Sequence, residues 1–254
     1  MTAELKSLSA SLTAPKLPDN LFTVTDIDAE LSKVRDDESD FIAADFSRLI
    51  CAETDFSAIC FRNCLFHGCR FTACDFSGCT FIDCVFKGCD ISNSDFSESY
   101  FKACSFISCK AVGTAFKYSF YKNVSFDGGS FELSDFQCSK LQSVAVTDTD
   151  FSSALFSSCE IKQTELKNVT LARSVFFGTK LAGLDFTSCN IEGLTVSDTG
   201  AELKGAKVDD ECSHISSRFD LQIFSFSLSV MLEEDKCGRR QCSQSCLVLS
   251  SNNE

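Results

Sequence analysis

The chain has 254 residues, of which 44% are hydrophobic and 23% charged, proportions that are ordinary for a folded protein. Its 36 acidic residues outnumber its 23 basic residues, and the resulting net charge of -13 argues against direct binding to nucleic acid. The sequence holds only two histidines and no apolar run of membrane-spanning length, which excludes most histidine-based catalytic and metal sites and a membrane location.

Residues 1–43 lack a regular period and precede the patterned part of the chain. The first residues contain no basic region followed by an apolar stretch, so we expect no signal peptide and a cytoplasmic location. Pro15 and Pro18 indicate a loop, and residues 26–35, with acids early and bases late, are expected to form a short helix. We interpret residues 1–43 as an N-terminal cap.

A bulky apolar residue recurs at every fifth position from Phe46 to Val196, giving 31 central positions without an insertion or deletion. Nineteen of these centres are Phe, the residue two before a centre is usually small or compact, and glycine recurs two after it. A helix or a flat strand would expose about half of such centres, whereas a chain that turns a corner once per repeat buries them all. Four sides then close a coil of about 20 residues, and coils stack at the β spacing of roughly 4.8 Å.

A 20-residue step is also visible when like residues are compared along the chain. It places seven rings in one predicted core ladder, formed by Phe56, Phe76, Phe96, Phe116, Phe136, Phe156 and Phe176. Ten of the 17 cysteines occupy the small inward position. We expect them to be buried, reduced thiols that fill space, because their spacing is not that of zinc sites and no signal peptide directs the chain to an oxidising compartment.

The five-residue motif, a small residue followed by Asp or Asn and then Phe or Leu, resembles that of the pentapeptide-repeat family. The stretch from Cys64 to Cys109 shows the Phe-centred form, and the resemblance covers about Ala44 to Thr199. It implies an all-β fold, a right-handed quadrilateral β-helix with about 20 residues per coil. We place this β-helix at residues 44–208, the last of which follow a slip of two residues in the register after Val196.

From Asp209 onward the five-residue pattern is absent. Residues 221–232 alternate apolar and polar side chains, a pattern typical of one strand. Cys212 and His214 stand near later cysteines, but at spacings that match no common zinc site. We expect the tail at residues 209–254 to be poorly ordered, or to be the product of an altered reading frame.

The sequence offers no catalytic group. His67 follows a centre in an outward position without a partner nucleophile, and the glycines form no phosphate-binding loop. We therefore expect a protein that is not an enzyme, holds no cofactor or metal, and acts as a rigid scaffold for protein–protein interaction. The resemblance includes Qnr-type quinolone-resistance proteins, acidic rods that bind DNA gyrase and topoisomerase IV, so a DNA mimic is the alternative function. A secreted bacterial effector is a second alternative.

Four aspartates in register before the Phe ladder form a candidate acidic interaction face: Asp55, Asp75, Asp95 and Asp135. The competing interpretation is structural, because short polar side chains in this position bond the local backbone. Lys117 interrupts the acidic row, and one other side carries a basic row: Arg62, Lys102, Lys122 and Lys162. The partner is expected to be a protein, and the oligomeric state stays open, a homodimer included.

Overall fold

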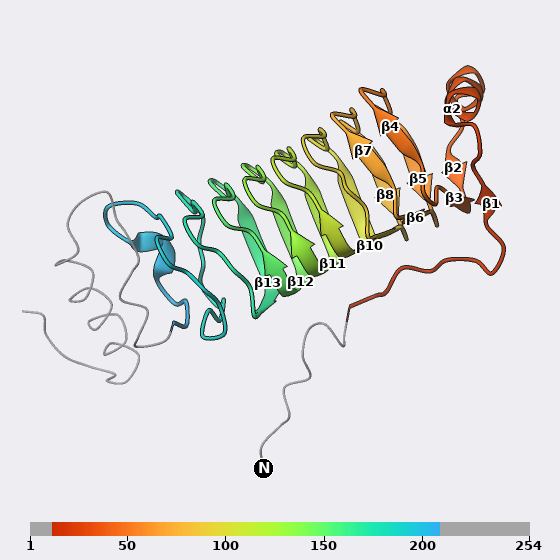
Figure 1. The fold of residues 1–254 in the computed structure, drawn as a ribbon. Helices are drawn as coiled ribbons and strands as arrows, with labels where there is room; N and C mark the ends of the chain where they lie inside the picture. Colours follow the sequence, from red (N-terminus) through yellow and green to blue (C-terminus); the bar gives the residue numbers. More distant parts are fainter. Residues whose placement is uncertain (1–11, 209–254) are drawn as a thin grey trace, which may run out of the picture.

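The computed structural model describes residues 12–208, which form a parallel β-solenoid of about seven turns (Figure 1). This confirms the fold class predicted from the five-residue period. Helix α2 (Ile27–Asp36) lies at one end of the solenoid, and the last described coil lies at the other. Within residues 12–208, no helix combines the length and the hydropathy needed to cross a membrane.

The strands of the early coils are short and those of the later coils are long. The short strands are β2 (Phe41–Ile42), β3 (Ala44–Asp45), β4 (Ile50–Ala52), β5 (Cys60–Arg62), β6 (Leu65–His67), β7 (Arg70–Thr72), β8 (Thr80–Ile82) and β9 (Val85–Lys87). The long strands are β10 (Tyr100–Lys110), β11 (Phe120–Ser130), β12 (Lys140–Asp150) and β13 (Glu160–Lys167). The pairs among these strands are parallel and 20 residues apart, as in Phe61 with Phe81 and Phe81 with Phe101.

The backbone turns at the second residue after each centre. From Glu38 to Gly193 this position has a positive φ in every repeat except at Ser188. Glycine adopts such angles without steric cost, and Asn and Asp tolerate them better than most residues. The recurrent turn expected from the glycine pattern is therefore present, although most of its positions carry a side chain, as at Asn63 with a φ of 54°.

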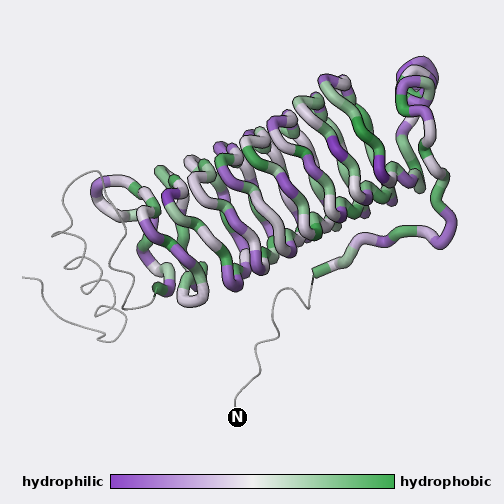
Figure 2. Tube along the Cα trace, in the orientation of Figure 1, coloured by the Kyte–Doolittle hydropathy of each residue, from purple (hydrophilic) through white to green (hydrophobic). Residues whose placement is uncertain are grey.

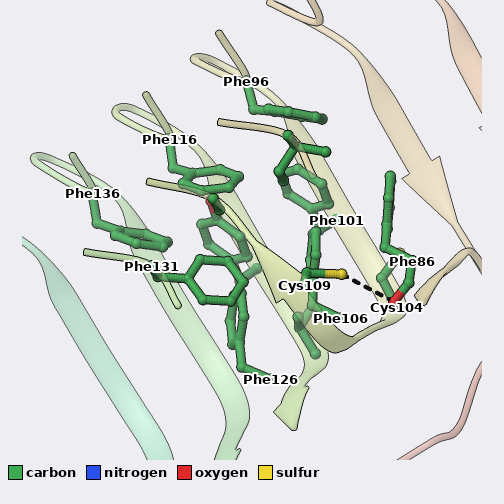
Figure 3. Packing of buried hydrophobic residues seen from close by; sticks show 14 of the residues in the cluster. Phe86, Phe96, Phe101, Cys104, Phe106, Cys109, Phe116, Phe126, Phe131 and Phe136 are labelled. Carbon is green, nitrogen blue, oxygen red and sulfur yellow. Dashed lines mark hydrogen bonds between the residues drawn. The ribbon is translucent and has the colours of Figure 1, made fainter. Parts of the chain in front are cut away.

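The interior of the solenoid is a column of stacked rings (Figure 3). Along the predicted ladder from Phe56 to Phe176, successive ring centroids are 4.5 to 5.4 Å apart. Rings on adjacent sides meet edge to face, as do Phe101 and Phe106 at 5.7 Å. Hydrophobic and hydrophilic residues alternate along the coils, as Figure 2 shows, because each side turns its centre inward and the flanking residues outward.

The small inward residues are also hydrogen-bond donors, a role that the sequence analysis did not assign. Ser99 Oγ donates to the carbonyl of Phe76 at 2.9 Å, and Cys84 Sγ donates to that of Phe61 at 3.3 Å. The same bond to the centre 23 residues earlier recurs in many coils, whereas Ser134 and Ser174 donate to the centre three residues earlier, Phe131 and Leu171. Nine of the ten inward cysteines are buried free thiols, as expected for their burial, and Cys189 is half-buried.

Helix α2 begins after Asp26, whose carboxylate accepts a hydrogen bond from the Ala29 backbone N–H at 3.1 Å. Leu31 and Val34 on this helix join the core, and strand β1 (Phe22–Thr23) pairs with β3. The first coil begins earlier than the expected boundary at residue 44, because Phe41 already pairs in register with Phe61. The position five residues before Phe41 is Asp36, the last residue of α2, so the run of apolar centres is broken by a charged residue there.

The backbone hydrogen bonds between successive coils are interrupted after β13. In most of the solenoid the N–H of each centre donates to the next coil, and Leu171 still donates to Asn190 at 2.7 Å and Phe176 to Thr195 at 2.8 Å. The hydrogen bonds of the described residues include none from Ile161 to Lys180 or from Leu166 to Asp185. Two sides of this coil are therefore joined to the next coil by backbone bonds. The two sides formed by β13 lack those bonds, and the corner after them is joined by Asn168 N–H, which donates to Ser188 Oγ at 3.2 Å.

The opening coincides with the expected slip in register. Asp185 pairs with Lys207, a step of 22 residues where the other bridges step by 20, and the short helix η1 (Ala201–Leu203) lies within this last coil. Ile161 and Leu166, the two centres on β13, are only half-buried. This corrects the expectation that all the centres are buried, and the cause is the missing coil contact on their outer side.

Candidate interaction surfaces

The aspartate face, defined by Asp55, Asp75, Asp95 and Asp135, lies along one side of the solenoid. Isolated bridges join Asp55 to Asp75 and Asp75 to Asp95, so three carboxylates stand on adjacent coils. The next position is Ala115, and beyond Asp135 the row continues with Leu155 and Val175. The negative row therefore covers three adjacent coils, is interrupted at Ala115, and returns once at Asp135 before apolar side chains follow.

Each aspartate on this face bonds its own turn. Asp75 Oδ1 and Asp95 Oδ1 each accept the backbone N–H two residues later at 2.8 Å, and Asp55 and Asp135 do the same. Hydrogen bonds from Ser57, followed by that from Arg35, lower the pKa of Asp55. Arg35 of helix α2 also forms an ion pair with Asp55 at 3.0 Å. The structure thus gives these carboxylates a local structural role and neutralises the first of them, a contact that sequence reasoning missed.

The lysine face, defined by Arg62, Lys102, Lys122 and Lys162, lies on another side and carries the predicted basic row. Lys102 and Lys122 stand directly opposite each other on β10 and β11, while Ile82 and Gln142 separate them from Arg62 and Lys162. Beside the two central lysines, the rings of Tyr100 and Phe120 lie 5.6 Å apart and are half-buried. This face joins cations to aromatic surface over the longest strands of the sheet.

Ion pairs neutralise the two ends of the lysine face but not its centre. Arg62 pairs with Asp40 at 3.0 Å, and Lys162 pairs with Glu160 at 3.6 Å. Among residues 12–208, neither Lys102 nor Lys122 has an acidic group within ion-pair distance. Two like charges on adjacent coils repel each other, so an anionic group placed between them would be attracted to both.

A cleft lies beside β13, where the backbone hydrogen bonds between coils are missing. It has a volume of about 770 Å³ and is lined on the β13 side by Ile161, Lys162 and Thr164 and on the other side by Ala182, Gly183 and Leu184. Beneath it, a void of about 40 Å³ is lined by twelve hydrophobic side chains and Thr164. Ile161, Thr164 and Leu184 line both spaces, so the cleft leads toward the core of the solenoid.

The described part of the chain contains no group of His, Cys, Asp or Glu residues that could hold a metal ion. His67 is exposed on β6, in the outward position that its place after Phe66 predicted. Cys212 and His214, with the rest of the tail at 209–254, lie outside the described residues.

Comparison with known proteins identifies the repeat. Residues 79–150 match the family model described as a pentapeptide repeat region. No curated protein matches the chain. Among solved structures, HetL, a pentapeptide repeat protein involved in heterocyst differentiation regulation in the cyanobacterium Nostoc, matches with a TM-score of 0.52 and 11% identity over 71% of this chain and 90% of its own.

Two further solved structures match with lower TM-scores. QnrB1, a plasmid-mediated fluoroquinolone resistance protein, matches in a trypsin-treated form with a TM-score of 0.38 and 19% identity over 78% of this chain and 100% of its own. A pentapeptide repeat protein from the thylakoid lumen of Arabidopsis thaliana matches with a TM-score of 0.30 and 21% identity over 36% of this chain and 66% of its own. The five-residue period, the coil geometry and the family match agree that residues 79–150 are a pentapeptide repeat region, within a solenoid whose fold is similar to that of HetL.

Proposed function

We propose that this chain is a non-catalytic, cytoplasmic rod that binds an acidic protein through the lysine face. The observation that supports it is the unpaired cation pair, Lys102 and Lys122, beside the rings of Tyr100 and Phe120. Aromatic residues are enriched in protein interfaces, and unpaired cations speed the approach of an acidic surface. A continuous parallel sheet holds these side chains in fixed positions, so little conformational freedom is lost on binding.

The test compares charge reversals on two faces of the same rod. Lys102→Glu combined with Lys122→Glu inverts the lysine face, and Asp75→Lys combined with Asp95→Lys makes an equal and opposite change on the aspartate face. The proteins retained by each variant from lysate are compared with those retained by the parent chain. We expect acidic proteins to be lost from the lysine-face variant and kept by the aspartate-face variant. Retention of the same acidic proteins by both variants would contradict the proposal.

A second candidate function, a DNA mimic that binds DNA gyrase or topoisomerase IV, is favoured by one observation. Asp55, Asp75 and Asp95 stand on adjacent coils, and duplex DNA likewise presents closely spaced charges. The ion pair of Arg35 with Asp55 and the gap at Ala115 weaken this resemblance to a phosphate backbone. A gyrase supercoiling assay in the presence of a quinolone tests it: protection that disappears in the Asp75→Lys/Asp95→Lys variant would favour the mimic over the lysine-face rod.

A further inference from the structure

The core centres beside the opening are smaller than those of the preceding coils. On the two sides that β13 continues, the coils up to β11 carry an aromatic ring at every centre, as at Tyr121 and Phe126. The next two coils carry aliphatic centres, which are Leu141, Val146, Ile161 and Leu166. All four line the void of about 40 Å³. Protein interiors are otherwise close-packed, so this void marks a place in the core with room for a further group.

The chemistry of the void favours a hydrocarbon chain. Thr164 is the one polar residue in its lining, and its hydroxyl donates to the carbonyl of Lys162 at 3.4 Å. A water molecule enclosed in a protein needs about two to four polar partners, and the void has room for about three water-sized groups at roughly 10–15 Å³ each. A straight alkyl chain therefore fits this void better than water or an aromatic ring. Such a chain can enter from the cleft, because Ile161, Thr164 and Leu184 line both spaces.

The mouth of the cleft carries an excess of positive charge. Lys162 lines the cleft and shares the carboxylate of Glu160 with Lys140, at 3.6 and 3.3 Å. Lys180 is exposed at the start of the opposite wall, and among residues 12–208 it has no acidic group within ion-pair distance. Three cations around one carboxylate leave a positive potential, which draws an anion toward the cleft.

A backbone donor lies beside these cations. At the equivalent corner of an earlier coil, Asn63 N–H donates to the carbonyl of Ile82 at 2.9 Å, whereas the described residues show no such bond from Gln163 N–H to Ala182. Gln163 and Ala182 both line the cleft. A carboxylate held there can accept the Gln163 N–H together with the ammonium of Lys162, and hydrogen bonds to an ionised acceptor are the stronger kind.

From these features we propose that the cleft binds a short aliphatic monocarboxylate, with its alkyl chain in the void and its carboxylate between Lys162 and Gln163 N–H. The apolar lining selects the chain, and the charge at the mouth selects an anion over an amine or an alcohol of equal length. The site makes no use of Lys102 or Lys122, so it is independent of protein binding through the centre of the lysine face.

Isothermal titration calorimetry of the full chain tests the proposal with butanoate, hexanoate and hexylammonium. We expect hexanoate to bind with one site per chain. Its Kd should be lower than that of butanoate by about fourfold for each added methylene, because each additional methylene leaves water for the void. Hexylammonium, which has the same chain and the opposite charge, should bind about tenfold more weakly than hexanoate.

Variants locate the chain and the carboxylate. Leu166→Phe fills the void with the ring that Phe106 and Phe126 place in the same column, and it should weaken hexanoate binding by about tenfold. The matched control, Leu155→Phe, makes the same change at a half-buried position that lines neither space, and it should leave the Kd unchanged. Lys162→Gln should weaken hexanoate binding without changing the affinity for 1-hexanol. Far-UV circular dichroism reports that each variant is folded.

Three results would overturn the proposal. One is the absence of saturable hexanoate binding at millimolar concentration. Another is equal affinity for hexanoate and hexylammonium, which would mean that the mouth does not select the carboxylate. The third is an unchanged Kd in folded Leu166→Phe, which would place the alkyl chain somewhere other than the void.

Discussion

Gly128 and Gly129 are adjacent, but a side chain added at each would meet different surroundings. Gly128 has a φ of 71° and occupies the corner position, where a Cβ would meet nothing closer than Ser108 Oγ at 3.6 Å. Gly129 has a φ of 102° and lies in the small inward position opposite Cys109, where a Cβ would lie 2.1 Å from the Cys109 carbonyl oxygen. That atom is backbone, so the overlap cannot be relieved by a change of rotamer.

The two alanine substitutions are therefore expected to differ in cost. Gly128→Ala adds only the left-handed backbone strain of an L-residue, about 1–2 kcal/mol. Gly129→Ala adds at least this strain, because its φ lies beyond the left-handed region open to L-residues, and it also forces β10 and β11 apart, leaving one or two buried backbone groups unpaired at about 1–3 kcal/mol each. We expect Gly129→Ala to lower the free energy of unfolding by about 3–6 kcal/mol, a large part of the stability of a typical domain.

Urea unfolding followed by far-UV circular dichroism measures both variants against the parent. Because repeat proteins unfold through partly folded states, the comparison uses the difference between the two variants, each placed at the same point of the rod. Losses that agree within about 0.5 kcal/mol would refute the close approach of Cys109 to Gly129, because that contact adds a cost at Gly129 alone.

Three further outcomes are expected. Tyr121→Phe should raise the free energy of unfolding by about 1–3 kcal/mol, because the Tyr121 hydroxyl is fully buried and has no hydrogen-bond partner in the described part of the chain. Iodoacetamide should label exposed Cys138 in the native chain and spare Cys79, whose pKa burial raises to about 12. Lys207→Gln should make the chain less resistant to acid, because hydrogen bonds from Lys207, and next from Thr187, lower the pKa of Asp185 to about 2.

The controls for these outcomes follow from the same contacts. A loss of stability in Tyr121→Phe would mean that the hydroxyl has a partner, and labelling of Cys79 at the rate of Cys138 would mean that the core opens readily. The contribution of Asp185 is complete above its ordinary pKa of 3.8 and is lost as the pH falls toward 2, so acid unfolding should begin at a higher pH in Lys207→Gln. Lys204→Gln, on an exposed lysine of the same coil, should leave that pH unchanged.

The regular part of the fold could be predicted because one period specifies both the turn and the stack. A centre at every fifth residue requires a corner per repeat, and the 20-residue step then aligns Phe56 with Phe76 and Asp55 with Asp75. The contact of Arg35 with Asp55 could not be predicted, since helix α2 has no period that relates it to the coils. Sequence reasoning found the acidic row but not the turn bonds and ion pair that occupy it.

The opening at β13 could not be predicted from the sequence for a different reason. Ile161, Leu166, Leu181 and Phe186 keep the five-residue period without a break. The period states which side chains point inward, but not whether one coil contacts the next. Smaller centres at Ile161 and Leu166, together with the 22-residue step from Asp185 to Lys207, are the signals that could have indicated the cleft.

The inward thiols and hydroxyls limit how a rod of this kind can change length during evolution. Most bonds from inward residues, as from Ser119 to Phe96 or from Cys104 to Phe81, span one whole coil and three residues more. Duplication or deletion of a complete coil leaves every donor opposite an acceptor of the same kind. Gain or loss of a single pentapeptide keeps the bulky residues inward but moves every later column to the next side, so the Asp row would change sides. Lineages of this rod should therefore differ in steps of 20 residues.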